Sequence, residues 1–264
     1  MSILNVEHLT HGFGDRAIFN DVSFRLLKGE HIGLVGANGE GKSTFLNILT
    51  GKLVPEEGRV AWCRRITRGY LDQHTVLEKG KSIRQVLQDA FSHLFELEAE
   101  MLQKYEEMGD CSEERMNELL QDVGEIQDIL EHSGFYMIDA RIQEVAQGLG
   151  LLDIGLEKDV TMLSGGQRSK VLLCKLLLEN PMILILDEPT RGIDIGTKTE
   201  IQKLVLDLAD QGMAVTFISS EVEEMLRTCS RMAVLRDGQK VGELEEDELS
   251  QSGVMKAIAG GDDK

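Results

Sequence analysis

The chain lacks any long apolar run, and its 264 residues include only four cysteines and six histidines. No stretch reaches the roughly 20 apolar residues that a membrane-spanning helix needs, and no basic-then-apolar leader opens the chain. We therefore expect a soluble, cytoplasmic protein. The cysteines are scattered without a C-x-x-C pair, at Cys63, Cys111, Cys174 and Cys229. That spacing predicts reduced thiols and not disulfides or a metal site.

Basic side chains are also scarce, and the formal net charge is −18. The deficit lies mainly in the middle of the chain. Residues 81–160 carry nineteen acidic and six basic side chains, whereas residues 1–80 carry nine and ten. A strongly acidic segment repels phosphate backbones, so we expect no binding to free nucleic acid. A solvated helical surface is the simplest interpretation of this segment.

The hydrophobic pattern changes twice along the chain. Residues 1–75 have the pattern of strands and turns, with strands expected over 19–27, 31–35, 59–62 and 67–71. From a Ser82…Gln85 capping-box pattern onward the spacing is helical, and it predicts an acidic hairpin of two helices joined by a turn over residues 109–112. From residue 161 helices and strands alternate, with helices expected over 166–178, 198–209 and 246–258 and from residue 221.

This alternation predicts an α/β fold with a mostly parallel sheet covered by helices. We expect one domain over residues 1–264. Its core should comprise residues 1–75 and 161–264, and residues 76–160 should form a helical insert.

A glycine-rich loop from Gly36 to Ser43 reads GANGEGKS and fits the G-x-x-x-x-G-K-[ST] pattern. Its glycines let backbone N–H groups converge on phosphate oxygens at a helix N-terminus. We expect Lys42 to reach the β- and γ-phosphates and Ser43 to ligate Mg²⁺. The residues expected to bind a nucleoside triphosphate here are Gly36, Asn38, Gly39, Gly41, Lys42, Ser43 and Thr44.

An apolar strand expected over residues 183–186 ends in two carboxylates, Asp187 and Glu188. Asp187 is the expected second Mg²⁺ partner, directly or through water. Glu188 lies where an attacking water would be activated, so it is the candidate general base. The alternative is that the two carboxylates merely end a strand.

A third motif starts at Ser164 and continues with Gly165, Gly166 and Gln167. Ser164 and Gln167 form a capping-box pattern, and the glycines permit close backbone approach. The motif therefore predicts a second helix N-terminus that can bind an anion. The spacing does not identify which phosphate it would contact, and a plain capped helix is the alternative.

Taken in order, residues 36–43, 163–167 and 183–188 resemble the Walker A, signature and Walker B motifs of ATP-binding cassette (ABC) ATPases. The resemblance implies a P-loop cassette with an N-terminal antiparallel β subdomain and an inserted helical subdomain. It also implies a head-to-tail dimer, in which ATP lies between the Walker motifs of one copy and the signature motif of the other. Three further roles follow from it: Gln73 contacts Mg²⁺ and the attacking water, Phe13 stacks on adenine, and Asp194 is the D-loop aspartate.

The subfamily resemblance divides near residue 187. Residues 36–47, the YLDQH run over 70–74 and the acidic insert resemble F-type ABC proteins (ABC-F), which are soluble, ribosome-associated ATPases. Residues 188–264, including RGIDIG over 191–196 and ISSE over 218–221, instead resemble the second cassette of ribose- and galactose-type sugar importers. This division predicts a composite chain, a chimera of the two types.

The missing histidine bears on turnover. ABC ATPases usually carry a switch histidine after the strand expected over 214–219, but this chain has Ser220 there, and no histidine follows His132. Ser220 and Glu223 also form a capping-box pattern for the next helix. Losing one transition-state contact typically costs about 2.7–4 kcal/mol, or about 10²–10³ in rate. We therefore expect ATP binding with slow hydrolysis, and Glu188, Gln73 and Ser220 as the catalytic residues.

Three contexts stay open. The chain could be a ribosome-associated ATPase module, although it has one cassette and its insert is acidic where an RNA-contacting arm should be basic. It could be the nucleotide-binding subunit of an importer that docks on a membrane permease near Gln73. It could also be a freestanding chimeric domain without a physiological partner.

Overall fold

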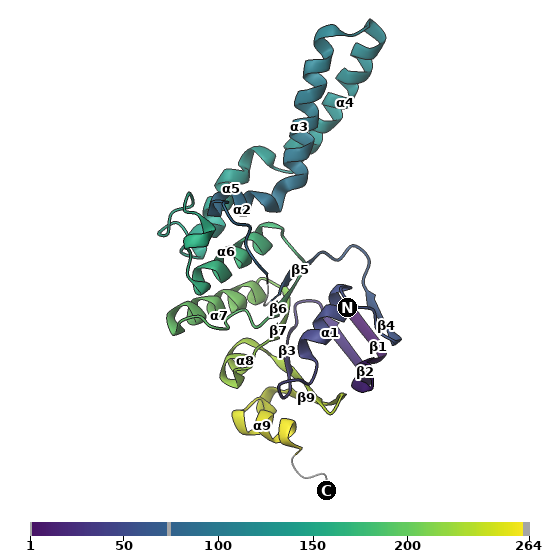
Figure 1. Ribbon diagram of the computed structural model, residues 1–264, viewed down its shortest axis with the longest axis vertical. Helices are drawn as coiled ribbons and strands as arrows, with labels where there is room; N and C mark the ends of the chain where they lie inside the picture. The colour runs from purple at the N-terminus through teal and green to yellow at the C-terminus, as the bar shows by residue number, and fades with distance from the viewer. Residues whose placement is uncertain (1, 73–74, 261–264) are drawn as a thin grey trace. The chain divides into compact units, whose positions relative to one another are not determined.

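The computed structural model describes residues 2–72 and 75–260. The chain divides into two compact units (Figure 1). The core unit comprises residues 1–76 and 180–264, and the helical unit comprises residues 77–179. The helical unit extends beyond the predicted boundary at residue 160, because α6 (Gly165–Leu178) packs against α2 (Ile83–Gln88) and α5 (Ile138–Gly148).

A six-stranded sheet forms the centre of the core unit, in the order β5-β6-β7-β3-β8-β9. Neighbouring strands from β5 to β8 run parallel, and β9 runs antiparallel to β8. The strands are β5 (Arg68–Leu71), β6 (Ile183–Asp187), β7 (Ala214–Ile218), β3 (His31–Val35), β8 (Arg231–Arg236) and β9 (Gln239–Glu245). The fold class predicted from the alternating pattern is confirmed.

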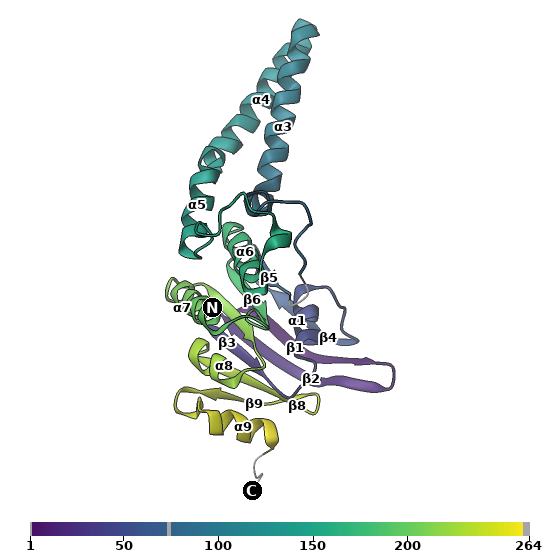
Figure 2. The same cartoon turned by 60° about the vertical axis from the view of Figure 1, so that its left-hand side comes forward.

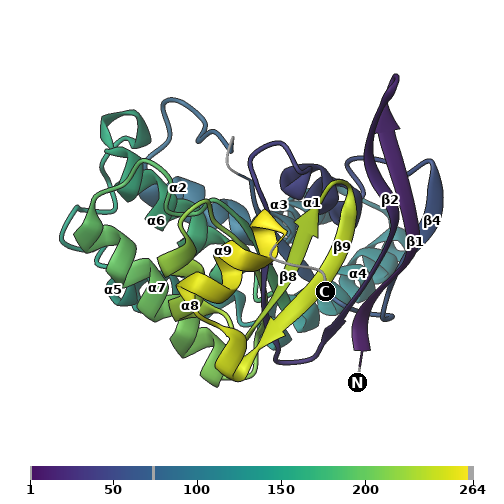
Figure 3. The ribbon, with the colours of Figure 1, turned by 90° about the horizontal axis from the view of Figure 1, so that it is seen from below.

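The two faces of this sheet are covered by different elements (Figure 3). Ile32 and Leu34 of β3 join a buried cluster with Phe45 and Leu46 of α1 (Lys42–Thr50) and with the antiparallel sheet. Gly33 points the other way, towards Met225 of α8 (Val222–Thr228). Because side chains alternate along a strand, both faces are apolar, and the sheet is buried on both sides.

The antiparallel sheet has the order β2-β1-β4, with β1 (Ser2–Phe13), β2 (Arg16–Leu27) and β4 (Glu57–Trp62) (Figure 2). The buried residues Val22, Phe24 and Leu26 alternate with exposed ones along β2. This period of two is typical of a sheet with one face on the core. The sheet matches the expected N-terminal antiparallel subdomain.

Two helices begin at positions that the sequence pattern missed. Helix α7 (Ile195–Asp210) begins three residues before the predicted residue 198, because the Asp194 side chain accepts a hydrogen bond from Thr197 N at 2.9 Å. Helix α9 (Gln251–Ala259) begins five residues after the predicted residue 246, where Ser250 Oγ accepts from Gly253 N at 3.1 Å.

The helical unit contains the predicted hairpin, formed by α3 (Ser92–Glu107) and α4 (Glu113–His132). Lys104 and Asp122 pair across it at 2.7 Å, and Leu119, Val123 and Ile126 of α4 are buried. The predicted capping box of Ser82 and Gln85 is present at the start of α2. No helix in the described part of the chain is long and apolar enough to cross a bilayer.

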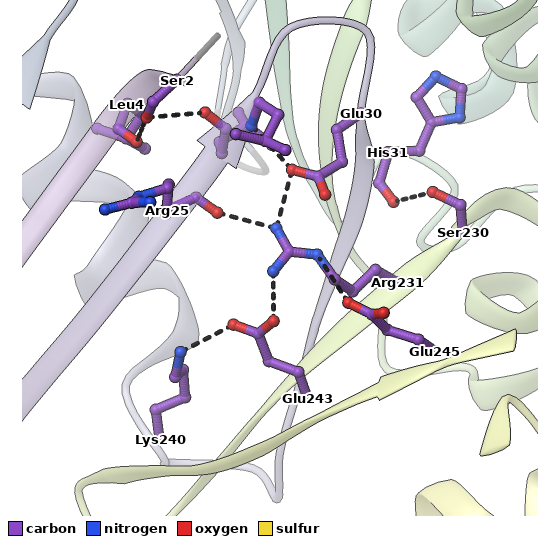
Figure 4. Close-up of polar contacts among 12 residues, drawn as sticks. Ser2, Leu4, Arg25, Glu30, His31, Ser230, Arg231, Lys240, Glu243 and Glu245 are labelled. Carbon is purple, nitrogen blue, oxygen red and sulfur yellow. Dashed lines mark hydrogen bonds and ion pairs between the residues drawn. The ribbon is translucent and has the colours of Figure 1, made fainter.

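A charged cluster around Arg231 joins the two sheets of the core unit (Figure 4). The Arg231 guanidinium donates to Glu30 at 2.8 Å, to the backbone oxygen of Arg25 at 2.9 Å, and to Glu243. Its side chain is 12% exposed, so the ion pairs lie largely out of water. Truncating a buried partner of this kind leaves uncompensated charges, which makes Arg231 a structural residue.

Candidate functional site

The glycine-rich loop connects β3 to α1 through tightly packed backbone. Gly41 caps α1 in the left-handed conformation, with φ of 83°. A Cβ at Gly41 would lie 2.4 Å from Ile18 Cγ2, and one at Gly36 would lie 2.6 Å from the oxygen of Leu235. Within the described residues no side chain caps α1. The first N–H groups of this helix are therefore available to an anion.

Lys42 lies folded over this loop. Its side chain is buried, and Nζ donates to the backbone oxygens of Gly36 at 2.8 Å and Ala37 at 3.0 Å. Burial lowers the pKa of Lys42, and the charges of Glu188 and Asp187 oppose that shift. The ammonium group is thus placed at the loop and within the field of both predicted carboxylates.

Asp187 ends β6 and is 2% exposed. Burial raises its pKa, and a hydrogen bond from the Ser43 side chain opposes that shift. Its Oδ1 atom is buried and has no hydrogen-bond partner in residues 2–72 and 75–260. An orphaned carboxylate oxygen beside a hydroxyl is a donor set that suits Mg²⁺, which binds oxygen ligands and takes few of them from protein. The predicted metal ligands Ser43 and Asp187 therefore fit the ion.

Those residues are too few to form a cage. The described residues contain no group of three or more His, Cys, Asp and Glu side chains able to hold a metal. Mg²⁺ bound with a nucleotide usually takes one or two protein ligands, and water and phosphate supply the others. The arrangement at Ser43 and Asp187 is of this sparse kind.

Glu188 follows Asp187 in a left-handed backbone conformation, with φ of 51°. Its N–H donates to the oxygen of Ile218 at 3.0 Å, and its Oε2 accepts from Ser220 Oγ at 3.1 Å. The predicted capping box of Ser220 and Glu223 is wrong, because Glu221 and not Ser220 immediately precedes helix α8. Helix α8 begins at Val222, and the position before it makes no side-chain capping bond.

A polar network behind Glu188 was not predicted from the sequence. The buried Glu224 carboxylate accepts hydrogen bonds from Thr190 Oγ1 at 2.6 and 2.7 Å, Ser219 Oγ at 2.5 Å and Gln202 Nε2 at 3.3 Å. One signal was present. Glu224 is the neighbour of the apolar Met225 in a short helix, and a carboxylate is rarely buried unless other polar groups bond to it.

The remaining predicted residues differ in their exposure and in the elements that carry them. Phe13 is 55% exposed at the end of β1, with the ring of buried His11 edge-on at 5.0 Å. Asp194 caps α7. Asn38 is exposed in the loop, and exposed Ser43 and half-buried Thr44 lie in the first turn of α1. Gln73, predicted to contact Mg²⁺ and the attacking water, lies outside the described residues.

The signature residues belong to the helical unit. The Ser164 side chain accepts from Gln167 N at 3.3 Å, and Gln167 Oε1 accepts from Ser164 N at 3.1 Å. The predicted capping box is therefore present at the start of α6. Gly165 and Gly166 form the first turn of that helix. Their contact with phosphate stays a prediction.

Comparisons with known proteins identify sequences that this chain resembles. Residues 19–191 match the family model described as ABC transporter. A Bacillus subtilis protein, the uncharacterized ABC transporter ATP-binding protein YfmM, is 66% identical over 194 residues, which are 74% of this chain and 38% of that protein. The ribose import ATP-binding protein RbsA of Caldanaerobacter subterraneus is 32% identical, over 98% of this chain and 48% of that protein. The chain thus spans less than half the length of these relatives.

Solved structures show the same fold. An ATP-binding subunit of an ABC transporter has a TM-score of 0.72 at 19% identity, covering 98% of each chain. A nucleotide-free ATP-binding cassette from an ABC transporter has a TM-score of 0.70 at 22% identity, covering 98% of this chain and 96% of that one.

Proposed function

Because the chain belongs to the ABC transporter family of ATP-binding proteins, we propose that it binds Mg-ATP at residues 36–43 and hydrolyses it in a head-to-tail dimer. The observation that carries the proposal is the buried Oδ1 of Asp187, which has no hydrogen-bond partner among the described residues. The same carboxylate accepts a hydrogen bond from the side chain of Ser43, the last residue of the glycine-rich loop. A carboxylate oxygen without a partner is free to ligate a cation that the bound phosphates also hold.

Each residue then has a defined task. The N–H groups at the start of α1 and the Lys42 ammonium bind the phosphates, and Ser43 and Asp187 hold Mg²⁺. When bound, Mg²⁺ supplies positive charge to the β- and γ-phosphate oxygens. Glu188 accepts the proton of the attacking water, with Gln73 beside it. Phe13 stacks on the base. Ser164 and the following glycines of the second copy complete the phosphate contacts.

We propose that turnover is slow. Ser220 occupies the position of the switch histidine, and its hydroxyl donates to Glu188 Oε2. A hydroxyl can orient the carboxylate but carries no positive charge to place against a phosphate. Removing one preorganised transition-state contact typically lowers the rate by about 10²–10³.

The context of the domain is proposed from its relatives. Those with import functions match at 32–33% identity over 92–98% of the chain, whereas the 66% relative covers 74%. We propose a composite chain, with an F-type part joined near residue 187 to an importer-type part, because residues 36–47 resemble the first type and residues 188–264 the second. We propose a cytoplasmic ATP-binding subunit that acts with a membrane permease. A ribosome-associated role is the second candidate, because the acidic hairpin of α3 and α4 belongs to the part that resembles the F-type proteins.

Phosphate release from ATP, measured together with molar mass, tests the proposal. We expect a monomer of 29.4 kDa without nucleotide, and twice that mass with Mg-ATP, accompanied by slow turnover. Failure to bind Mg-ATP would refute the site. Co-purification with a permease would support the importer context, and co-sedimentation with ribosomes would support the alternative.

A further inference from the structure

We infer that Glu224 is a positioning residue for hydrolysis. Its hydrogen bonds fix the chain segments that carry Glu188 and Ser220, so that these two residues stay in contact. The inference rests on the proposed function for its catalytic consequence. Glu224 lies in α8 and is 2% exposed. Its carboxylate contacts no reacting group. It acts through the three side chains that donate to it, those of Thr190, Ser219 and Gln202.

These donors come from three separate segments of the core unit. Thr190 follows Glu188 by two residues, in the connection after β6. Ser219 precedes Ser220 directly, after β7. Gln202 lies in α7, the helix that Asp194 caps. One carboxylate therefore links the segment of the candidate base, the segment of the switch position and the helix of the D-loop aspartate.

These hydrogen bonds, together with the backbone over residues 188–190 and 219–220, form a closed ring. Ser220 Oγ donates to Glu188 Oε2 at 3.1 Å, and Glu224 joins the two segments through Ser219 at 2.5 Å and Thr190 at 2.6 Å. Ser219 Oγ also accepts from Glu221 N at 3.1 Å, so its hydroxyl has one orientation that satisfies both neighbours. A shift of either segment would break at least one bond of the ring.

Electrostatics make this ring stiff. Among the described residues, Glu224 makes no ion pair, so its buried charge is balanced by neutral donors. A buried carboxylate that loses such donors bears a large desolvation penalty, because hydrogen bonds to charged groups are stronger than neutral ones. That penalty opposes motion of Thr190 and Ser219. It also supports the left-handed backbone of Glu188, a conformation that persists only where its surroundings hold it.

The test replaces Glu224 by glutamine, which keeps the size and removes the charge. Amide hydrogen exchange over residues 188–191 and 219–221 is expected to quicken in Glu224→Gln, and kcat to fall by about tenfold to a hundredfold. The Kd for Mg²⁺ with a non-hydrolysable ATP analogue should stay within about twofold, because Lys42 and the loop at 36–43 do not contact Glu224.

Thr228→Val is the matched control. Thr228 is buried in the same helix and donates to the backbone oxygen of Glu224 at 2.9 Å, but it does not contact the carboxylate. This variant should lose some stability and keep kcat. A merely structural role for Glu224 would give the two variants the same profile, with lower stability and unchanged kcat and exchange at 188–191, and that result would overturn the inference.

A double variant tests whether Glu224 acts through Ser220. If it does, Ser220→Ala and Glu224→Gln should lower kcat by less in combination than the product of their separate effects. A fully multiplicative loss would contradict the inference. If the unmodified chain binds the analogue but releases no phosphate, the proposed function fails, whereas the exchange comparison still decides the role of Glu224. If Glu224→Gln does not fold, Thr190→Val and Ser219→Ala each remove one donor and are judged by the same exchange and kcat criteria.

Discussion

Ser220 Oγ donates a hydrogen bond to Glu188 Oε2 across 3.1 Å, although 32 positions separate the two residues in the chain. Sheet register brings them together. Strands β6 and β7 run parallel with Asp187 opposite Ile218, so both chain segments leave the sheet at the same edge. The residue at the switch position therefore contacts the candidate base directly.

Ser220→His is expected to raise ATP turnover by about tenfold or more. Imidazole would restore a γ-phosphate contact that strengthens in the transition state. The substitution should cost little stability, because Ser220 makes no capping bond to α8. Steady-state phosphate release checks the expectation, with Ser220→Ala as the control for loss of the hydroxyl. Brisk hydrolysis by the unmodified chain, or no gain in the variant, would show that the missing histidine is not limiting.

Lys42→Ala is expected to weaken ATP binding by at least about a hundredfold, since it removes the cation that meets the phosphates. The fold should persist, because Nζ contacts loop oxygens and not the apolar core. Calorimetric titration with an ATP analogue and a thermal melt would measure both effects. Lys28→Ala, at an exposed position of the core unit, is the matched control. If Lys42→Ala bound the ATP analogue with unchanged affinity, the assignment of residues 36–43 as the phosphate-binding loop would be refuted.

Glu188→Gln is expected to accumulate as a head-to-tail dimer with Mg-ATP. The amide cannot take the proton of the attacking water, so the nucleotide would stay intact between the copies. Light scattering with and without Mg²⁺ checks the mass. A persistent monomer at saturating Mg-ATP would rule out the dimer for this chain, and a mismatch between the two halves of a composite interface would be the physical reason.

Stability should fall with acidification partly through His31. Burial lowers the pKa of His31 below its ordinary value of 6.5, and a backbone hydrogen bond at Met213 opposes the shift. The unfolded chain therefore binds a proton at His31 before the folded chain does as the pH falls. The stabilising effect is complete above about pH 6.5 and is lost as the pH falls towards the folded-state pKa.

Thermal melts of His31→Gln should accordingly show a smaller loss of Tm between about pH 7.5 and 5.5 than the unmodified chain. His93→Gln is the control, because His93 is exposed. Parallel pH profiles for all three proteins would contradict this assignment.

The four thiols should separate into two classes. Burial raises the pKa of Cys174 and of Cys229 to about 12, whereas Cys63 and Cys111 are only half-buried. Since the thiolate is the reactive form, a disulfide reagent near about pH 8 should modify two thiols quickly and the other two only on unfolding. Cys63→Ser and Cys111→Ser should each remove one fast equivalent. Four equal rates would contradict the burial of Cys174 and Cys229.

Local features were predictable because they depend on neighbours in the sequence. The loop between β3 and α1 follows from the glycine spacing around Lys42, and the capping boxes at Ser82 and Ser164 join residues three apart. The alternation of strands and helices likewise indicated the parallel sheet.

The sequence alone therefore determined the nucleotide-binding loop, the two capped helix starts and the α/β class, since hydrophobic period and capping act within a turn or two of chain. Only tertiary structure decided what Ser220, Glu224 and Arg231 do. Ser220 hydrogen-bonds to Glu188, 32 positions away, and Glu224 accepts from Thr190, 34 positions away. Arg231 donates to Glu30, 201 positions away. Ser220 has a good local alternative as a helix cap, yet its hydroxyl bonds to Glu188, because the order of β6 and β7 in the sheet places that carboxylate within reach.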